Sequence, residues 1–171
     1  MRSRASTALA AGFVMTTVGG LAYAADACDA LTARMIRATG ASLAGRAGSG
    51  AVFRAADAER MSLACRAPRR MVFGSLAREP DRPFFALIGR AAEALTGAKA
   101  AAVEVLALTL HQDSLLTGAP RQGIAGRAAL RCETGPRADS LAGNITVCIL
   151  TGSGATPLRR RAGLFVRRPA G

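Results

Sequence analysis

His111, Asp113 and Ser114 bring an imidazole, a carboxylate and a hydroxyl together in one short segment of the chain. These are the residue types of nucleophilic hydrolysis, in which a base activates the hydroxyl and an acid orients the base. Adjacent residues seldom reach that geometry, because their side chains leave the backbone in different directions. We therefore favour a polar cluster at the end of a strand. A hydrolase that uses His111 with Asp113 is the least favoured of three functional hypotheses.

Two pairs of carboxylates lie close together in the sequence, Asp57 with Glu59 and Glu79 with Asp81. Most glycosidases use two carboxyl groups, one as proton donor and the other as nucleophile or base. Asp81 is better explained as the N-cap of a helix, and the other three residues fall in predicted turns. Lys99 is not followed by Ser or Thr, as a Walker-type phosphate loop requires. The sequence therefore predicts no catalytic residue and no cofactor.

The N-terminus predicts export. Arg2 and Arg4 form a short basic region, an apolar stretch follows, and residues 22–24 form an Ala-x-Ala cleavage site. We predict a signal peptide over residues 1–24 and a single domain over residues 25–171, located in the periplasm or secreted. No transmembrane segment is predicted after cleavage. An uncleaved anchor is the alternative, because the apolar stretch is just long enough to span a bilayer.

All four cysteines, Cys28, Cys65, Cys132 and Cys148, lie in the part of the chain predicted to be exported. An even number of cysteines in an oxidising compartment predicts two disulfides. None of them forms a Cys-x-x-Cys pair, and the chain has one histidine, so neither a thioredoxin-like site nor a zinc site is indicated. We predict that the cysteines stabilise the fold and that the chain binds no metal.

The sequence leaves the disulfide pairing open. Pairing the first cysteine with the second and the third with the fourth stabilises the fold by roughly 4 and 3 kcal/mol, in the chain-entropy description. A faint internal repeat relates residues 60–69 to residues 127–137. If that repeat is real, two helix-plus-strand units form one sheet. Its symmetry then favours pairing the second cysteine with the third and the first with the fourth.

The chain is strongly basic, with 23 Lys and Arg against 11 Asp and Glu and a formal charge of +12. No acidic residue follows Asp139, and segment 158–171 carries a group of arginines: Arg159, Arg160, Arg161, Arg167 and Arg168. Guanidinium groups bind phosphate and carboxylate in a bidentate fork. These arginines are candidate anion-binding residues toward lipid head groups, lipopolysaccharide, acidic glycans or another envelope component. The simpler interpretation is a solvated basic edge strand that discourages aggregation.

Composition argues against several classes of partner. The chain has no Trp, one Tyr and six Phe, which leaves few aromatic platforms for a sugar cleft or a single-strand binder. We expect no nucleic-acid partner, because the chain is predicted to be exported and carries no zinc-finger, zipper or RRM-type pattern. Contact with an anionic membrane is electrostatically reasonable but weak and sensitive to salt.

The first half of the chain predicts one helix followed by strands. Residues 26–40 have helical spacing of apolar positions, with Asp26 as N-cap and Gly40 at the end. Residues 45–50 read as a loop. Three strands are predicted from alternation over residues 51–54, 60–66 and 70–76.

The second half begins with the clearest helix, which starts at Asp81, has Pro83 in its first turn and ends at Gly97. Residues 101–111 are ambiguous, because Ala and Leu favour a helix whereas the alternating Val and Thr favour a strand, and we predict a strand. Further strands are predicted over residues 127–133, 144–151 and 163–169. Residues 144–150 are apolar on both faces, so this strand is expected in the centre of the sheet.

These elements predict an α+β fold in which two core-facing helices pack on an antiparallel sheet of about five to seven short strands, stapled by disulfides. The favoured function is a small exported binding or structural module that is not an enzyme and whose ligand the sequence does not specify. The second hypothesis is a binder of anionic surfaces that uses the C-terminal arginines.

Overall fold

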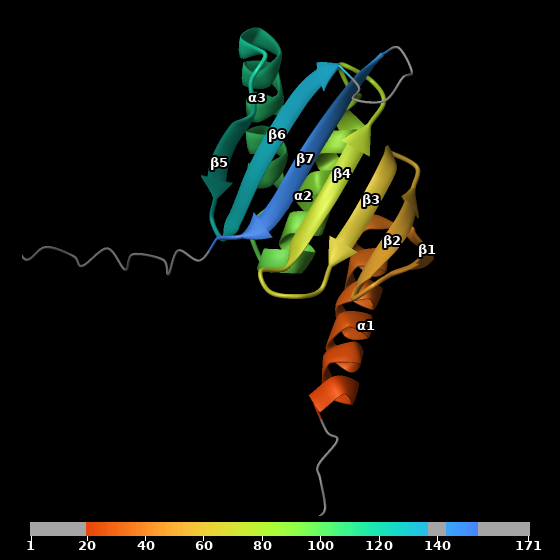
Figure 1. Ribbon diagram of the computed structural model, residues 1–171. Helices are drawn as coiled ribbons and strands as arrows, with labels where there is room; N and C mark the ends of the chain where they lie inside the picture. Colours follow the sequence, from red (N-terminus) through yellow and green to blue (C-terminus); the bar gives the residue numbers. More distant parts are fainter. Residues whose placement is uncertain (1–19, 137–142, 154–171) are drawn as a thin grey trace, which may run out of the picture.

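Three helices pack on one face of a seven-stranded antiparallel sheet (Figure 1). The computed structural model describes residues 20–136 and 143–153. In chain order the elements are α1 (Gly20–Thr39), β1 (Ser42–Ala47), β2 (Gly50–Ala55), β3 (Ala58–Ala64), β4 (Arg70–Ser75), α2 (Arg82–Thr96), α3 (Ala100–Thr117), β5 (Arg121–Ala125), β6 (Ala128–Pro136) and β7 (Asn144–Gly152). The predicted α+β class and the antiparallel sheet are confirmed, with one helix more than expected.

The sheet consists of two meanders joined at its centre. Its strand order is β1-β2-β3-β4-β7-β6-β5, so β4 ends the first meander and pairs with β7, the last strand of the second. Strand β7 is hydrogen-bonded on both sides, as predicted from its apolar sequence. Strands β1 and β5 are the two edges.

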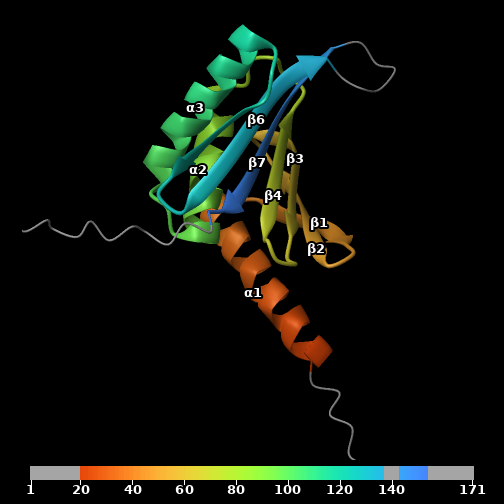
Figure 2. The same ribbon diagram turned by 60° about the vertical axis from the view of Figure 1, so that its left-hand side comes forward.

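The core lies between the sheet and the helices (Figure 2). Because side chains alternate between the two faces of a strand, every second residue points toward the helices. These residues align in rows across neighbouring strands. One row comprises Leu63, Met71, Leu150 and Leu130, and the next comprises Phe53, Met61, Phe73, Cys148 and Cys132.

Helix α2 agrees with its predicted boundaries. Asp81 is the N-cap in extended conformation, a proline follows in the first turn, and Gly97 ends the helix in the left-handed conformation, where its N–H donates to the Glu93 carbonyl oxygen. The Asp81 side chain makes no capping hydrogen bond; its backbone oxygen instead accepts from Phe84 N–H at 3.0 Å. The spacing of the apolar residues therefore predicts this helix correctly.

Residues 101–111 form part of helix α3, and the predicted strand is wrong. The buried residues of α3 follow helical spacing at Val103, Ala107 and Leu110. Val105 and Leu116 are nevertheless 63% and 85% exposed, so apolar side chains occur on the outer face of the helix as well. These exposed residues obscure the helical period that would have identified the element.

Other boundaries also differ from expectation. Helix α1 begins at Gly20, so Asp26 lies inside the helix and is not its N-cap. The Ala-rich sequence before Asp26 supports a helix, and nothing in it stops one. Residues 45–47 of the predicted loop belong to β1, and β5 was not expected. The predicted strand over residues 163–169 lies outside the described residues.

Of the helices that the structure describes, none is both long and apolar enough to cross a membrane. The first half of α1 extends beyond the end of the sheet in both views (Figures 1 and 2). Its second half packs on the core through Leu31 and Met35, which are almost fully buried.

Gly89 allows α2 and α3 to approach closely. A Cβ atom at this position would lie 2.6 Å from the Ala100 carbonyl oxygen, which is backbone and has little freedom to move. We predict that Gly89→Ala lowers the free energy of unfolding by about 1–3 kcal/mol, although Ala has the higher helix propensity. Urea unfolding measures this change. Gly135→Ala is the control, because nothing lies within 4 Å of a Cβ there. A Gly89→Ala protein as stable as the parent contradicts the close approach.

Candidate functional site

The structure separates His111 from Asp113. His111 is 4% exposed on the inner face of α3, and its ring lies 5.3 Å from the ring of Phe85. Asp113 is exposed. Residues two apart on a helix do not face each other, so the two side chains do not form a base and its orienting acid. The pair proposed for a hydrolase is therefore not brought together.

His111 instead belongs to a buried chain of hydrogen bonds. Its Nδ1 lies 3.1 Å from Thr134 Oγ1, which lies 3.1 Å from Thr146 Oγ1. Thr146 Oγ1 donates to the backbone oxygen of Ala77 at 3.0 Å, with the Arg78 oxygen at 3.2 Å. A hydroxyl has one proton and a carbonyl oxygen only accepts, so Thr134 donates to Thr146 and His111 Nδ1–H donates to Thr134.

This network has a structural role. Ser114 Oγ accepts a hydrogen bond from Thr134 N–H at 3.0 Å, in addition to the contacts of His111. Helix α3 is thus tied to β6, to β7 and to the segment that leads from β4 into α2. Thr134, Thr146 and Ser114 are all buried, and no buried side-chain N or O atom in the described part lacks a partner. A satisfied network of this kind specifies one arrangement of the core.

Burial lowers the pKa of His111, and the nearby Glu79 carboxylate opposes this shift only partly. The folded protein therefore binds a proton at His111 less readily than the unfolded chain does.

We predict that the free energy of unfolding falls as the pH drops below about 6.5, the ordinary pKa of histidine, because the unfolded chain gains a proton that the folded state resists. Urea unfolding at pH 7.5 and pH 5.5 measures the difference. His111→Gln is expected to reduce it, since His111 is the one histidine of the chain. An unchanged difference in that variant contradicts the assignment.

The four carboxylates singled out in the sequence do come together. Asp57, Glu59, Glu79 and Asp81 line one hollow of about 430 Å³ between the β2–β3 turn and the start of α2. Alanines form much of its wall, and Phe84 also lines it.

Two of these carboxylates have structural partners. Asp57 lies 3.5 Å from Arg90, and Glu59 Oε2 accepts a hydrogen bond from Leu76 N–H at 3.1 Å. Asp81 and Glu79 precede the N-terminus of α2, where the helix dipole favours negative charge. Among residues 20–136 and 143–153, no group of three or more His, Cys, Asp or Glu is arranged to hold a metal ion. The carboxylates that line this hollow are therefore explained by their stabilisation of the helix and of the turn.

The disulfides pair in sequence order, Cys28 with Cys65 and Cys132 with Cys148. The alternative pairing suggested by the internal repeat is wrong. Cys132 and Cys148 face each other on β6 and β7 and are fully buried. Cys28 on α1 and Cys65 after β3 are only half-buried.

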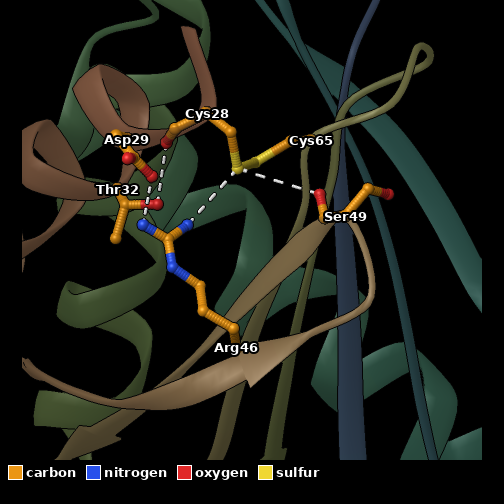
Figure 3. A network of polar contacts seen from close by, with 6 residues as sticks. All are labelled: Cys28, Asp29, Thr32, Arg46, Ser49 and Cys65. Atoms are coloured by element: carbon orange, nitrogen blue, oxygen red, sulfur yellow. Dashed lines mark hydrogen bonds and ion pairs between the residues drawn. A yellow bond between two sulfur atoms is a disulfide. The ribbon is translucent and has the colours of Figure 1, made fainter. Parts of the chain in front are cut away.

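A polar cluster surrounds the Cys28 sulfur (Figure 3). Arg46 Nη1 lies 3.7 Å from Cys28 Sγ, and its Nη2 forms an ion pair with Asp29. The Ser49 carbonyl oxygen lies 3.8 Å from the same sulfur. Thr32 Oγ1 donates to the Cys28 carbonyl oxygen at 2.8 Å. The β1–β2 hairpin thereby approaches this half of the disulfide.

The opposite face of the sheet, here called the open face, carries no helix in the part of the chain that the structure describes (Figure 1). The strand registers place a half-buried aliphatic band across it, with Ile124 more exposed at the β5 edge. The band consists of Val52, Val72, Ile145, Val147 and Ile149. A shallow hollow of about 200 Å³ adjoins this band between β2, β3 and β4.

Arginines surround the aliphatic band. Arg54, Arg60, Arg70 and Arg131 point to the open face and are exposed, whereas Glu133 is the one carboxylate on the described strands that shares it. Arg131 forms an ion pair with Glu133 at 3.3 Å. Gly74 lies opposite Arg60 and leaves room for its side-chain stem. The open face therefore carries a net positive charge.

These arginines were not predicted as site residues, although the sequence contains a signal for them. Each one directly precedes or follows a large apolar residue of the buried face, as in Phe53–Arg54 and Arg70–Met71. Alternation along a strand then places all four on the opposite face. The candidate anion-binding residues of the tail, Arg159, Arg160, Arg161, Arg167 and Arg168, lie outside the described residues.

Comparisons with protein-family models, curated protein sequences and solved structures give no significant match to this chain.

Proposed function

We propose that this chain is an exported, non-catalytic binding module whose open face contacts the phosphate groups of an anionic lipid surface. The observation that carries the proposal is the combination, on one sheet face, of exposed arginines with a half-buried aliphatic band. Export is supported by the predicted signal peptide and by two disulfides, which persist in oxidising compartments.

The chemistry of the open face fits an anionic amphiphile. Guanidinium groups bind phosphate oxygens in a bidentate manner, and each basic residue near an anionic membrane contributes about 1 kcal/mol. The aliphatic side chains are only partly exposed, so they favour contact with the interface over deep insertion. Acidic glycans offer charge but little apolar surface, and the phenylalanines of the described strands and helices are buried. Lipid phosphate therefore fits better than a glycan.

A second copy of the chain is a poor occupant of the open face. Two such faces in contact would place exposed arginines such as Arg54, Arg60 and Arg70 against one another. Like charges brought together in an interface oppose association. The described part of the face offers Glu133 alone as a carboxylate partner, and Arg131 already contacts it.

Binding to vesicles tests the open face. We expect the purified protein to bind vesicles of phosphatidylglycerol in phosphatidylcholine, and to be released by salt because the attraction is screened. Arg60→Gln with Arg70→Gln removes two positive charges and is expected to weaken binding roughly tenfold to thirtyfold. Sedimentation of vesicles over a lipid titration measures the partition coefficient.

The matched control is Arg34→Gln with Arg37→Gln, which removes the same charge from exposed positions on α1. This control is expected to bind almost as well as the parent. Equal losses in the two double variants would mean that net charge alone attracts the protein, and would overturn the role of the open face. Heparin competing as strongly as lipid would point to an acidic glycan instead.

The C-terminal arginines are the second candidate surface, favoured by the concentration of positive charge in segment 158–171. Truncation after Leu158 removes Arg159 and the other four arginines of this group. The truncated protein is compared directly with the Arg60 and Arg70 double variant. If truncation abolishes vesicle binding and the double variant retains it, segment 158–171 is the binding surface and the open face is not.

The mass of the protein recovered from an exporting host tests the first half of the proposal. We predict a mature protein that starts at Ala25 and is four hydrogens lighter than its reduced form, because it contains two disulfides. Intact-mass spectrometry with and without reductant measures both. A full-length protein that retains reduced thiols would contradict export.

A further inference from the structure

The two disulfides differ in their surroundings, and the difference bears on their chemistry. Cys132 and Cys148 are fully buried between the sheet and the helices. Cys28 and Cys65 are half-buried at the periphery, where α1 meets the loop between β3 and β4. Exchange with an external thiol requires access to a sulfur atom, so the peripheral disulfide is the one open to attack.

The two sulfurs of this peripheral disulfide are not equivalent. The Arg46 guanidinium lies 3.7 Å from Cys28 Sγ through Nη1, while Asp29 binds Nη2 and so fixes the orientation of the group (Figure 3). A cation beside a sulfur stabilises its thiolate form. In thiol–disulfide exchange the sulfur that leaves as the more stable thiolate leaves faster. Cys28 is therefore the better leaving group.

The neighbourhood of Cys65 favours the incoming reactant. Cys65 directly follows β3 and is followed in sequence by Arg66 and Arg69, both exposed. The attacking species is an anionic thiolate, which a positively charged loop attracts.

We propose that Cys28–Cys65 is a thiol–disulfide exchange site with a defined direction. A thiolate of an external dithiol attacks Cys65 Sγ and forms a mixed disulfide with it, while the Cys28–Cys65 bond breaks and Cys28 leaves as a thiolate beside Arg46. The second thiol of the dithiol then attacks the first sulfur of the same dithiol, which is the one bonded to Cys65 in the mixed disulfide. Cys65 is released as a thiol, the dithiol is oxidised to its disulfide, and two electrons reduce the protein.

Reduction at this site changes the fold locally. Leu31 and Met35 remain buried in the core and hold the second half of α1 in place. Helix α1 continues on the N-terminal side of Cys28, away from these two buried residues. In the mature chain, which is predicted to begin at Ala25, only three residues precede Cys28, so exchange loosens the start of α1 and leaves the sheet folded. This inference does not depend on the proposed lipid contact.

Limited reduction under native conditions tests the order of the two disulfides. The folded protein is treated with a limiting amount of dithiothreitol, quenched with iodoacetamide and mapped by mass spectrometry. We expect alkylation of Cys28 and Cys65 while Cys132–Cys148 stays oxidised. Reduction of Cys132–Cys148 first, or of both disulfides at the same rate, overturns the proposal.

The direction of exchange has its own test. Glutathione, a monothiol, is expected to be trapped on Cys65, and its recovery on Cys28 overturns the direction. Arg46→Met is expected to slow the exchange roughly threefold to tenfold. Arg46→Lys keeps the positive charge and is expected to restore the rate. Arg34→Met on the exposed side of α1 is the matched control and leaves the rate unchanged.

A thiol titration separates the effect of charge from any effect of Arg46→Met on access. In the Cys65→Ser protein the pKa of Cys28 is expected below its ordinary value of about 8.5 and to rise on Arg46→Met. Thiolate absorbance measures it. A Cys28 pKa that does not respond to Arg46→Met overturns the role of the guanidinium.

Discussion

The antiparallel pairing of β4 with β7 is the contact on which the rest of the fold depends. Without it, each meander would be a small sheet with an exposed edge and an incomplete core. Pairing aligns Met71 with Leu150 and Phe73 with Cys148, so that the buried rows of the two meanders become continuous. Helices α2 and α3 and strands β5 and β6 lie between β4 and β7 in the sequence, and β7 is the last strand of the described residues. The central contact is therefore also among the most distant in sequence.

The sheet separates two kinds of surface that the same alternation creates. On one face, apolar side chains and the His111 network hold the helices. On the other, arginines adjacent in sequence to those apolar residues point away from the core. An Arg that neighbours a buried Met or Phe is thus fixed in direction by the packing of its neighbour. The charge of the open face follows from the requirements of the core.

The parts of the fold that were predictable are those in which local pattern and burial agree. Helix α2 has its cap, its proline and one apolar stripe, and its boundaries were predicted from them. Helix α3 was not, because Val105 and Leu116 are apolar and exposed. The edge strands β1 and β5 are rich in Gly, Ala and polar residues with low strand propensity, so only pairing with a neighbour makes them strands.

The candidate site residues likewise divide into those that the sequence predicted and those that it did not. The disulfides pair in sequence order, which is one of the two pairings that the sequence left open. The two copies of the internal repeat do occupy equivalent places, since β3 and β6 flank the central β4–β7 pair. The four carboxylates were noted as pairs, but their meeting in one hollow depends on the β2–β3 turn lying beside the segment that leads from β4 into α2. The burial of His111 was not readable, because it depends on α3 being a helix.

Cys132–Cys148 closes a short covalent ring around the connection between β6 and β7. A cut in the backbone within this ring would leave both new ends attached to the same pair of strands. The chain could then be cleaved in this connection, or given new N- and C-termini there, and the disulfide would still link β6 to β7. The ring thus makes this connection a natural place for a new pair of termini or an inserted peptide.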